Sequence, residues 1–352
     1  MFVDQLKAFF PAHKDIKYLA FWAAVIYGLF GVLYAFVFKG NIYLLLAMGG
    51  ALNSAFIELR LIEFHFTHRF RMITAINITV IIPFVLGCIC ASYTLLAILG
   101  LLAASVILAL TGNANKLVNV FAFVFSLLFV LGLNLPIHLI EAIYYGASLA
   151  AGTLIMSLVS LIHFSIKREP DSIPMNELLL DKSWCSFTQS KITYCVFLAV
   201  SACAAYGIAK GFDIPNSFWA PMTVFIVLKF DKEASYKLIW HRLIGTLCGI
   251  IAASPLIFFI HSPSVLIILI PVLMLLTTIL AIGKYYGIYV FFLTMLTVIG
   301  FACLKDAGIE SLESRLWDTL IGVGISALVI YILVPIYRKI LKPNAYTTAH
   351  NI

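Results

Sequence analysis

Two His-Arg pairs are the residues best suited to chemistry on an anion. His68-Arg69 and His241-Arg242 each stand at the start of a long apolar stretch. A guanidinium stays charged and binds a carboxylate through two parallel hydrogen bonds. A histidine can change charge near neutral pH and so couple proton flow to transport. The pairs therefore predict a carboxylate site. Alternatively, the arginines anchor span ends by snorkelling to lipid headgroups, and the histidines, beside a cation that disfavours imidazolium, have a hydrogen-bonded structural role.

An aromatic residue and a proline suggest what lines the path of such an anion. Trp219, Pro221 and Thr223 occur within one short apolar stretch. A proline in a membrane helix frees a backbone carbonyl, which is tolerated where it lines a cavity, and the indole offers a face on which an aromatic ring can stack. This combination predicts part of a path for an aromatic anion. The alternative places Trp219 in the packed bundle or in the aromatic belt at the outer interface.

Charged residues near the starts of two other apolar stretches predict a third feature. Glu141 stands near one start, and Glu313, Arg315 and Asp318 stand near the other. A carboxylate inside a membrane is costly and is by default a functional hypothesis. Because these residues are expected near the interface, where that cost is small, we interpret them as an outer gate or as outer-end salt bridges rather than as proton carriers.

Other patterns argue against a metal site, a redox site and common enzyme motifs. The seven cysteines include no CxxC pair and no His/Cys cluster with zinc-ligand spacing, so we interpret them as small apolar side chains in helices. No P-loop, HExxH or GxSxG motif occurs. The sequence thus predicts no metal, no cofactor and no enzyme activity. Gly245 and Gly249 form a GxxxG pattern, which predicts close packing of one helix near the axis of the bundle.

The composition fixes the elements that must position these residues. Of the 352 residues, 63% are apolar and 11% are charged, against about 45–50% apolar and 25% charged in a soluble domain. An ordinary soluble enzyme, a disordered chain and a coiled coil are thereby excluded. The net charge of +7 is expected from basic cytoplasmic loops and does not indicate nucleic acid.

The apolar runs predict twelve transmembrane helices, each needing about 20 residues. They lie near residues 18–38, 42–57, 73–91, 94–112, 118–134, 138–165, 192–209, 215–229, 243–260, 264–282, 285–302 and 315–336. The second and eighth are short. The long polar stretch 166–191 predicts a cytoplasmic linker between a first six-helix repeat, residues 1–165, and a second, residues 192–352, which ends in a short cytoplasmic tail.

Basic residues predict the orientation. With the N-terminus in the cytoplasm, nineteen of the 23 Lys and Arg residues fall inside, and the four outside are Lys39, Lys210, Lys305 and Arg315. Such a bias is typical of cytoplasmic loops. We therefore expect an N-in, C-in protein.

The two halves resemble each other at an offset of 173 residues. His68-Arg69 falls on His241-Arg242, Ala47 falls on Ala220, and Glu58 falls on Asp231. Because six spans is an even number, the halves would share one orientation and be related by an axis along the membrane normal. Matched residues would then face one another around a central path, as in a pore or a rocking transporter.

Three segments resemble the fusaric acid resistance protein-like family, which includes the aromatic acid exporters. They are Trp219-Ala-Pro-Met-Thr223, the run Arg242-x-x-Gly245-Thr246-x-x-Gly249, and the last span from Arg315-Leu-Trp-Asp318 to Pro335. The resemblance covers about residues 190–336 and is weaker over 17–165. Plant aluminium-activated malate channels are similar in their membrane part, which has six spans per chain and a dimeric anion pore.

The resemblance implies a multi-pass protein of the bacterial inner membrane that exports small aromatic or other weak organic acids. Many family members carry a large cytoplasmic region, whereas this chain has only the stretch 166–191. We expect a secondary exporter of small organic anions, in particular aromatic carboxylates. The alternatives are a passive anion channel and a membrane scaffold or assembly subunit. Expected partners are the lipid bilayer and the anion, with a periplasmic adaptor protein and a homodimer left open, and no nucleic acid.

Overall fold

The structure is a computed structural model. It describes residues 14–37, 41–60, 66–112, 116–135, 137–167, 188–260, 263–281, 285–305 and 308–336. The predicted linker, 166–191, therefore lies largely outside the described residues.

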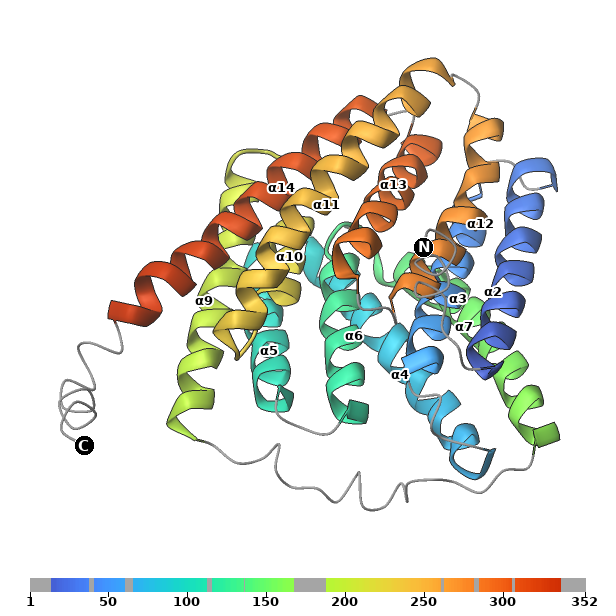
Figure 1. The fold of residues 1–352 in the computed structure, drawn as a ribbon, viewed down its shortest axis with the longest axis horizontal. Helices are drawn as coiled ribbons and strands as arrows, with labels where there is room; N and C mark the ends of the chain where they lie inside the picture. Colours follow the sequence, from blue (N-terminus) through green and yellow to red (C-terminus); the bar gives the residue numbers. More distant parts are fainter. Residues whose placement is uncertain are drawn as a thin grey trace, which may run out of the picture.

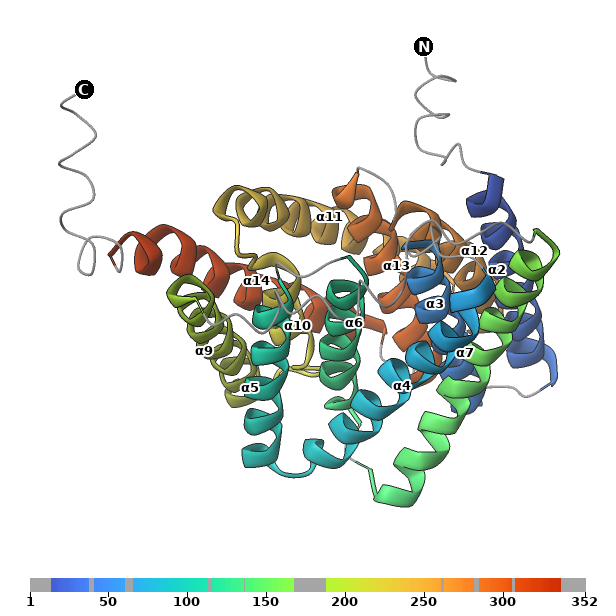
Figure 2. The same ribbon diagram turned by 90° about the horizontal axis from the view of Figure 1, so that it is seen from below.

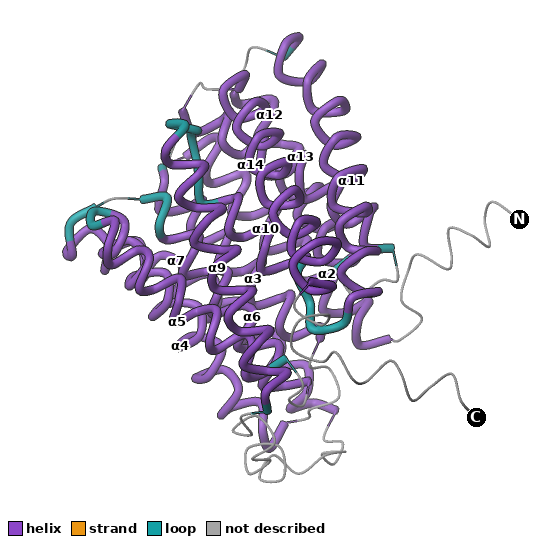
Figure 3. Tube along the Cα trace, turned by 90° about the vertical axis from the view of Figure 1, so that its left-hand side faces the viewer, coloured by secondary structure: helices purple, strands orange, loops and turns teal. Residues whose placement is uncertain are grey.

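The described residues form twelve α-helices and no strand (Figure 3). In the first half they are α2 (Lys14–Val32), α3 (Ile42–Arg60), α4 (Phe66–Ala91), α5 (Thr94–Thr111), α6 (Lys116–Gly132) and α7 (Leu139–Lys167). In the second half they are α9 (Gln189–Gly211), α10 (Trp219–Val227), α11 (Lys232–Phe259), α12 (Pro263–Leu280), α13 (Tyr286–Lys305) and α14 (Gly308–Leu328). One π-helical turn continues α2 over Leu33–Val37, and another continues α14 over Val329–Leu333.

The lengths and composition of these helices fit a bilayer. Within the described residues, nine helices are long and apolar enough to cross a membrane, and α6 and α12 contain shorter apolar segments. The prediction of an all-helical, multi-pass membrane protein is thereby confirmed. Several predicted boundaries are wrong. Helix α3 continues to Arg60. Helices α4 and α14 each begin seven residues before the predicted start of their span, and α11 begins eleven residues before it.

The short helix α10 has only nine residues. The chain turns sharply before it, with Asp213 and Asn216 at positive φ angles of 51° and 59°. Pro221 lies in the first helical turn, where the missing N–H group would have no intrahelical acceptor. The predicted freeing of a backbone carbonyl inside a membrane helix therefore does not apply to Pro221, because it lies at the start of α10 and not in its interior.

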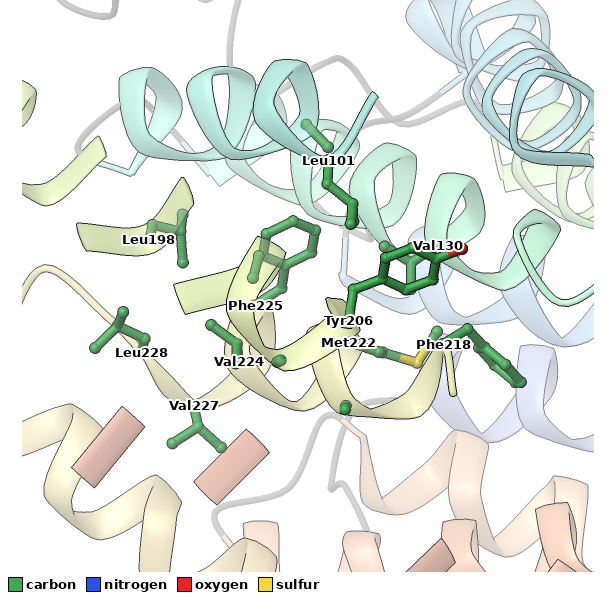
Figure 4. Close-up of a cluster of buried hydrophobic side chains, with 14 of the residues drawn as sticks. Leu101, Val130, Leu198, Tyr206, Phe218, Met222, Val224, Phe225, Val227 and Leu228 are labelled. Carbon is green, nitrogen blue, oxygen red and sulfur yellow. The ribbon is translucent and has the colours of Figure 1, made fainter. Parts of the chain in front are cut away.

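Helix α10 lies in the middle of the molecule (Figures 1 and 2). Eight of its nine residues are buried. Met222, Val224 and Phe225 pack in an apolar cluster with Leu101 of α5 and Leu198 of α9 (Figure 4). A short element surrounded in this way is held by its neighbours rather than by its own backbone hydrogen bonds.

Contacts within one half recur in the other. Helix α3 packs on α7, and α10 packs on α14; α4 packs on α6, and α11 packs on α13. Across the halves, α5 lies beside α9 and α12 lies beside α2 (Figures 1 and 2). The two halves therefore exchange neighbours instead of forming two separate bundles.

Glycines allow the closest helix contacts. A methyl group added at Gly152 of α7 would overlap the carbonyl oxygen of Ala47 on α3. A methyl group added at Gly322 of α14 would lie 2.7 Å from the carbonyl oxygen of Ala220 on α10. Ala47 and Ala220 are a pair matched by the 173-residue offset, so the matched residues occupy equivalent contacts in the two halves.

Candidate functional site

A cavity of about 520 Å³ lies among helices of both halves. Residues from α3, α6, α10, α12 and α13 supply most of its lining, which is largely apolar and includes Phe56, Phe123 and Trp219. Its volume falls within the range of about 300–1,000 Å³ that is usual for small-molecule sites. Polar groups are few, and they determine what the cavity can hold.

Arg242 of α11 is the principal polar group of the cavity lining. Its side chain is 0% exposed to solvent, and none of its three guanidinium nitrogens has a hydrogen-bond partner among the described residues. Tyr286 and Tyr289 of α13 also line the cavity, and both interact electrostatically with Arg242. The hydroxyl of Tyr286 lies near enough to Arg242 for a side-chain hydrogen-bond interaction, but neither group forms a hydrogen bond of standard geometry with any described residue.

A second arginine, Arg60, lines the cavity from the end of α3. It donates a hydrogen bond of 2.8 Å from Nη2 to the carbonyl oxygen of Ala281, and it stacks over the ring of Phe56 at 4.7 Å. Its Nε has no partner. Tyr289 interacts electrostatically with Arg60 as well as with Arg242, so the two cations act on the same part of the cavity.

A third arginine, Arg315 of α14, lies against Trp219. Its Cζ is 3.7 Å from the centroid of the indole ring, which is a cation–π contact. Arg315 is 1% exposed, and Asp318, one turn further along α14, is 0% exposed. Arg315 interacts electrostatically with Asp318 and with Arg242. No nitrogen of the Arg315 guanidinium and no carboxylate oxygen of Asp318 has a hydrogen-bond partner in the described part of the chain.

The positive charge extends to the loop between α10 and α11. Lys229 in this loop donates a hydrogen bond of 3.2 Å to the carbonyl oxygen of Phe225 and lies over the ring of Phe123 at 4.8 Å. Burial, reinforced by the charge of Arg60, lowers the pKa of Lys229 from 10.5 to about 8. The lysine is therefore mostly cationic at neutral pH and adds to the field of Arg60.

These charges favour an anion in the cavity. A buried guanidinium without hydrogen bonds carries a large desolvation penalty. Arg60, Arg242 and Arg315 contribute three positive charges, and Asp318 contributes at most one negative charge. A carboxylate that accepted hydrogen bonds from Arg242 would satisfy its donors and reduce the excess charge.

The structure separates the predicted His-Arg residues. Arg242 is buried at the cavity, whereas His241 is exposed and lies against Tyr286, with ring centroids 6.4 Å apart. His68 and Arg69 belong to α4, but their side chains lie outside the described residues. The role predicted for the first His-Arg pair therefore stays a prediction.

The residues predicted on the eighth span all lie in α10. Trp219 is 6% exposed and lines the cavity, so it is part of the packed bundle and not of a lipid-facing belt. Pro221 and Thr223 are buried without being part of the cavity lining. Thr223 packs against Gly322 of α14, and its hydroxyl has no partner in the described part of the chain.

The four residues predicted as an outer gate fall into two groups. Glu141 and Glu313 are exposed. Arg315 and Asp318 are buried, so the expected low cost of burial does not hold for them, whereas their predicted position near the membrane interface stays a prediction. Because α14 begins at Gly308, both residues lie well inside the helix and face its neighbours.

Gly245 and Gly249 pack α11 against α13. A methyl group at Gly245 would lie 2.6 Å from the carbonyl oxygen of Gly287, and one at Gly249 would lie 2.8 Å from that of Phe291. The described residues contain no group of His, Cys, Asp and Glu side chains that could hold a metal ion. The six cysteines in the described ranges are free thiols.

Arg60, Tyr286 and Tyr289 were not predicted from the sequence as site residues. The two tyrosines are three positions apart at the start of a span, a spacing that places them on one face of a helix. Arg60 falls three residues after the predicted end of the second span, so it was assigned to a loop. The tyrosine spacing was a usable signal, whereas the position of Arg60 required the true end of α3.

Several residues of the candidate site lie in the part of the chain that resembles a known protein family. The family described as fusaric acid resistance protein-like matches residues 198–329, a segment that contains Trp219, Arg242, Arg315 and Asp318. An uncharacterized protein of Synechocystis sp. is 31% identical over 130 residues, which are 37% of this chain and 17% of that relative. The chain thus matches less than a fifth of the length of this curated relative. No solved structure matches the chain.

Proposed function

We propose, from the match of residues 198–329 to the fusaric acid resistance protein-like family, that this chain is a secondary membrane transporter that exports small organic anions. The family and the many apolar helices support membrane transport and a non-enzymatic role. Aromatic carboxylic acids are the substrate class that we infer, and the bacterial inner membrane is the location that we infer.

The observation that carries the proposal is the buried, unpartnered guanidinium of Arg242 beside an apolar cavity. A carboxylate can accept two parallel hydrogen bonds from this group, while an aromatic ring packs on Trp219 and the apolar lining. Arg60 and Tyr289 would raise the affinity for the carboxylate. The small number of polar groups leaves the rest of the ligand in an apolar environment, which favours a ring over a sugar or a peptide.

We propose that the chain consists of two parallel six-helix repeats, residues 1–165 and 192–352, joined by the cytoplasmic linker 166–191, with both termini in the cytoplasm. The recurring helix pairs α3–α7 and α10–α14 support a repeat, as do the matched contacts of Ala47 and Ala220. The cavity among helices of both halves then corresponds to the central path between the repeats.

In the proposed mechanism the anion enters from the cytoplasm near Lys229 and Arg60 and binds at Arg242. It then passes Trp219 toward Arg315 and the outer end, and in this proposal Glu141 and Glu313 form a gate there. The cationic groups supply binding energy along the path, and their separate positions let the anion leave one for the next. The apolar walls exclude water between these positions, which strengthens each electrostatic contact.

The test uses the full chain in liposomes loaded with radiolabelled benzoate, with and without a pH gradient and a membrane potential. Export is expected to exceed that from protein-free liposomes loaded with the same benzoate. Arg242→Gln is expected to lower the rate by about tenfold or more, because a hydrogen bond to a charged group contributes about 1.5–3 kcal/mol. Lys237→Gln, an exposed position on the same helix, is the control and should retain the rate.

Three outcomes separate the alternatives. Flux that follows the membrane potential and saturates poorly, with no dependence on a pH gradient, would assign a passive anion channel. No flux of any weak acid, together with a partner that co-purifies, would assign a scaffold or assembly subunit. If Arg242→Gln leaves the flux unchanged, Arg242 has a structural role and no role in transport.

A further inference from the structure

Asp318 is a buried carboxylate that the transport path described above does not use. It is 0% exposed, and neither of its oxygens has a hydrogen-bond partner among the described residues. Arg315, one turn earlier on α14, interacts with it electrostatically without forming a hydrogen bond. A buried carboxylate without hydrogen bonds is costly in its ionised form, so its charge state depends on the cations beside it.

The charged and titratable groups around this pair come from several helices. On α14 itself, Arg315 acts on Asp318. From the neighbouring helices, Arg242 of α11 and Tyr286 and Tyr289 of α13 act on Arg315. The sequence of α10 contains no titratable side chain, and no group of α9 is among those that act on Arg315 or Asp318. Asp318 is therefore the acid of a cluster in which Arg315 and Arg242 are the cations.

We infer that Asp318 is the internal counter-charge of Arg315, and that protonation of Asp318 releases Arg315 to share the transported anion with Arg242. This inference rests on the proposed function, because it assumes an anion at Arg242. Its geometric basis is the contact of Arg315 with Trp219, 3.7 Å from Cζ to the ring centroid. The same ring lines the cavity at which Arg242 lies, so an anion beside Trp219 comes under the influence of both arginines.

Binding of the anion at Arg242 and binding of a proton at Asp318 reinforce each other. When Asp318 is ionised, it neutralises Arg315 and repels an anion at Arg242. When a proton from water binds the carboxylate, both effects disappear. An anion bound at Arg242 in turn makes the ionised form of Asp318 less favourable. Anion binding is thus linked to the uptake of one proton, and the affinity falls by up to about tenfold per pH unit over the range in which that proton is lost.

The experiment measures benzoate binding by isothermal titration calorimetry, with the full chain in lipid nanodiscs. The pH is varied from about 6 to about 9, a range in which benzoate stays ionised. Benzenesulfonate, an anion at every pH used, is the second probe. Repeating each titration in buffers of different ionisation enthalpy counts the protons taken up. We expect little proton uptake at the lower end of this range, where Asp318 already carries its proton, and close to one proton per anion toward the upper end, with a dissociation constant that rises with pH for both probes.

Two variants and a control assign the proton. Asp318→Asn, which removes the ionisable group, is expected to bind benzoate at high pH as tightly as the unmodified protein does at low pH, with most of the proton uptake lost. Lys229, whose pKa is about 8, loses its charge in the same range and accounts for any weaker dependence that remains. Asp318→Glu should retain the proton uptake. Glu310→Gln removes an exposed acid from the same helix and should change nothing.

The results that overturn the inference differ from those that overturn the proposed function. Binding by the unmodified protein without proton uptake at any pH in this range would leave the anion site in place and show that Asp318 has no role in it. An Asp318→Asn variant with the same pH dependence as the unmodified protein would have the same meaning. If neither probe binds at any pH, the anion site itself fails, and the inference that rests on it fails too.

Discussion

Buried polar side chains are hydrogen-bonded in the first half of the chain, whereas around Arg242 in the second half they are not. Thr153 of α7 donates a hydrogen bond of 2.6 Å to Asn77 of α4, and Ser160 of α7 donates one of 2.7 Å to Glu58 of α3. These bonds join neighbouring helices. In the first half, among the described residues, buried side-chain atoms without a partner are confined to the hydroxyl of Tyr34 and Nε of Arg60.

Buried polar side chains around Arg242 in the second half differ from those of the first half. Arg242, Arg315 and Asp318 lack partners for every polar side-chain atom, and so do the hydroxyls of Thr246 and Thr319. Most buried polar groups in proteins are satisfied, and exceptions require an explanation. The first half thus joins helices through hydrogen bonds between polar side chains, whereas the polar side chains around Arg242 lack such bonds within the described residues, as the proposed anion site requires.

The largest effect is expected from Arg242→Met, which removes the charge and keeps the volume. Anion export should fall by about tenfold or more, because a charge-assisted hydrogen bond contributes about 1.5–3 kcal/mol. The midpoint of thermal unfolding in detergent without substrate should rise, because an unpaired buried charge is destabilising. Loss of export together with a lower midpoint would mean that Arg242 stabilises the fold, and the contrast between the halves would disappear.

The next largest effect is expected on stability, from a substitution at the contact between α3 and α7 in the first half. Gly152→Ala places a methyl group against the carbonyl oxygen of Ala47, so we expect a loss of about 1–3 kcal/mol in unfolding free energy. Gly28→Ala on α2 is the control, since a methyl group there meets no atom within 4 Å; it should be neutral or slightly stabilising. Equal stability of the two variants would show that α3 and α7 can separate at no cost.

A pair of isosteric substitutions tests the hydrogen bonds themselves. Thr153→Val removes the bond to Asn77 and should destabilise the protein by about 1 kcal/mol. Thr246→Val removes a hydroxyl that is 1% exposed and has no partner in the described part of the chain, so it should be neutral or stabilising. Denaturant unfolding of both variants in the same detergent gives the two values. The opposite order would contradict the comparison.

The smallest expected effect is on selectivity. Trp219→Leu removes the ring that stacks on Arg315 and lines the cavity. The preference for benzoate over acetate should fall by about two- to fivefold, because such aromatic contacts contribute about 0.5–1 kcal/mol. Competition with labelled benzoate measures this ratio. Trp240→Leu, at an exposed position of α11, should leave the ratio unchanged; an equal change in both variants would exclude a specific role for Trp219.

Much of the fold could be predicted from the sequence because apolar runs bounded by charges define membrane helices. Each of the twelve predicted spans overlaps a helix of the structure, and nine of the described helices are long and apolar enough to cross a membrane. Helix α10, with nine residues, is too short to cross a bilayer. The prediction was weakest where a charge lies inside a helix. Arg60 belongs to α3, and Arg315 belongs to the interior of α14, yet hydropathy ends or begins a span at such residues. The sequence therefore places Arg60 in a loop and Arg315 at the first position of a span, although both belong to the cluster of charges at the cavity.

The candidate site was predicted in part. Arg242 and Trp219 stand out because the residue types suit an anion and because their motifs resemble a family. The sequence predicts Asp318 as part of an outer gate. Its burial depends on how α14 packs against α10, α11 and α13, and no local sequence pattern indicates this packing. Tyr289 interacts with Arg242 and Arg60, residues that are distant in sequence, so only the tertiary packing brings the three together.

The exchange of neighbours between the halves has a consequence for biosynthesis. Tyr27 of α2 forms a hydrogen bond of 3.1 Å with Thr278 of α12, 251 positions later in the chain. At about 5–20 residues per second, α2 waits about 10–50 s for this partner after it has been synthesised. During that time its buried face contacts lipid or the insertion machinery. Helix α12 must therefore be synthesised before α2 can reach its final packing.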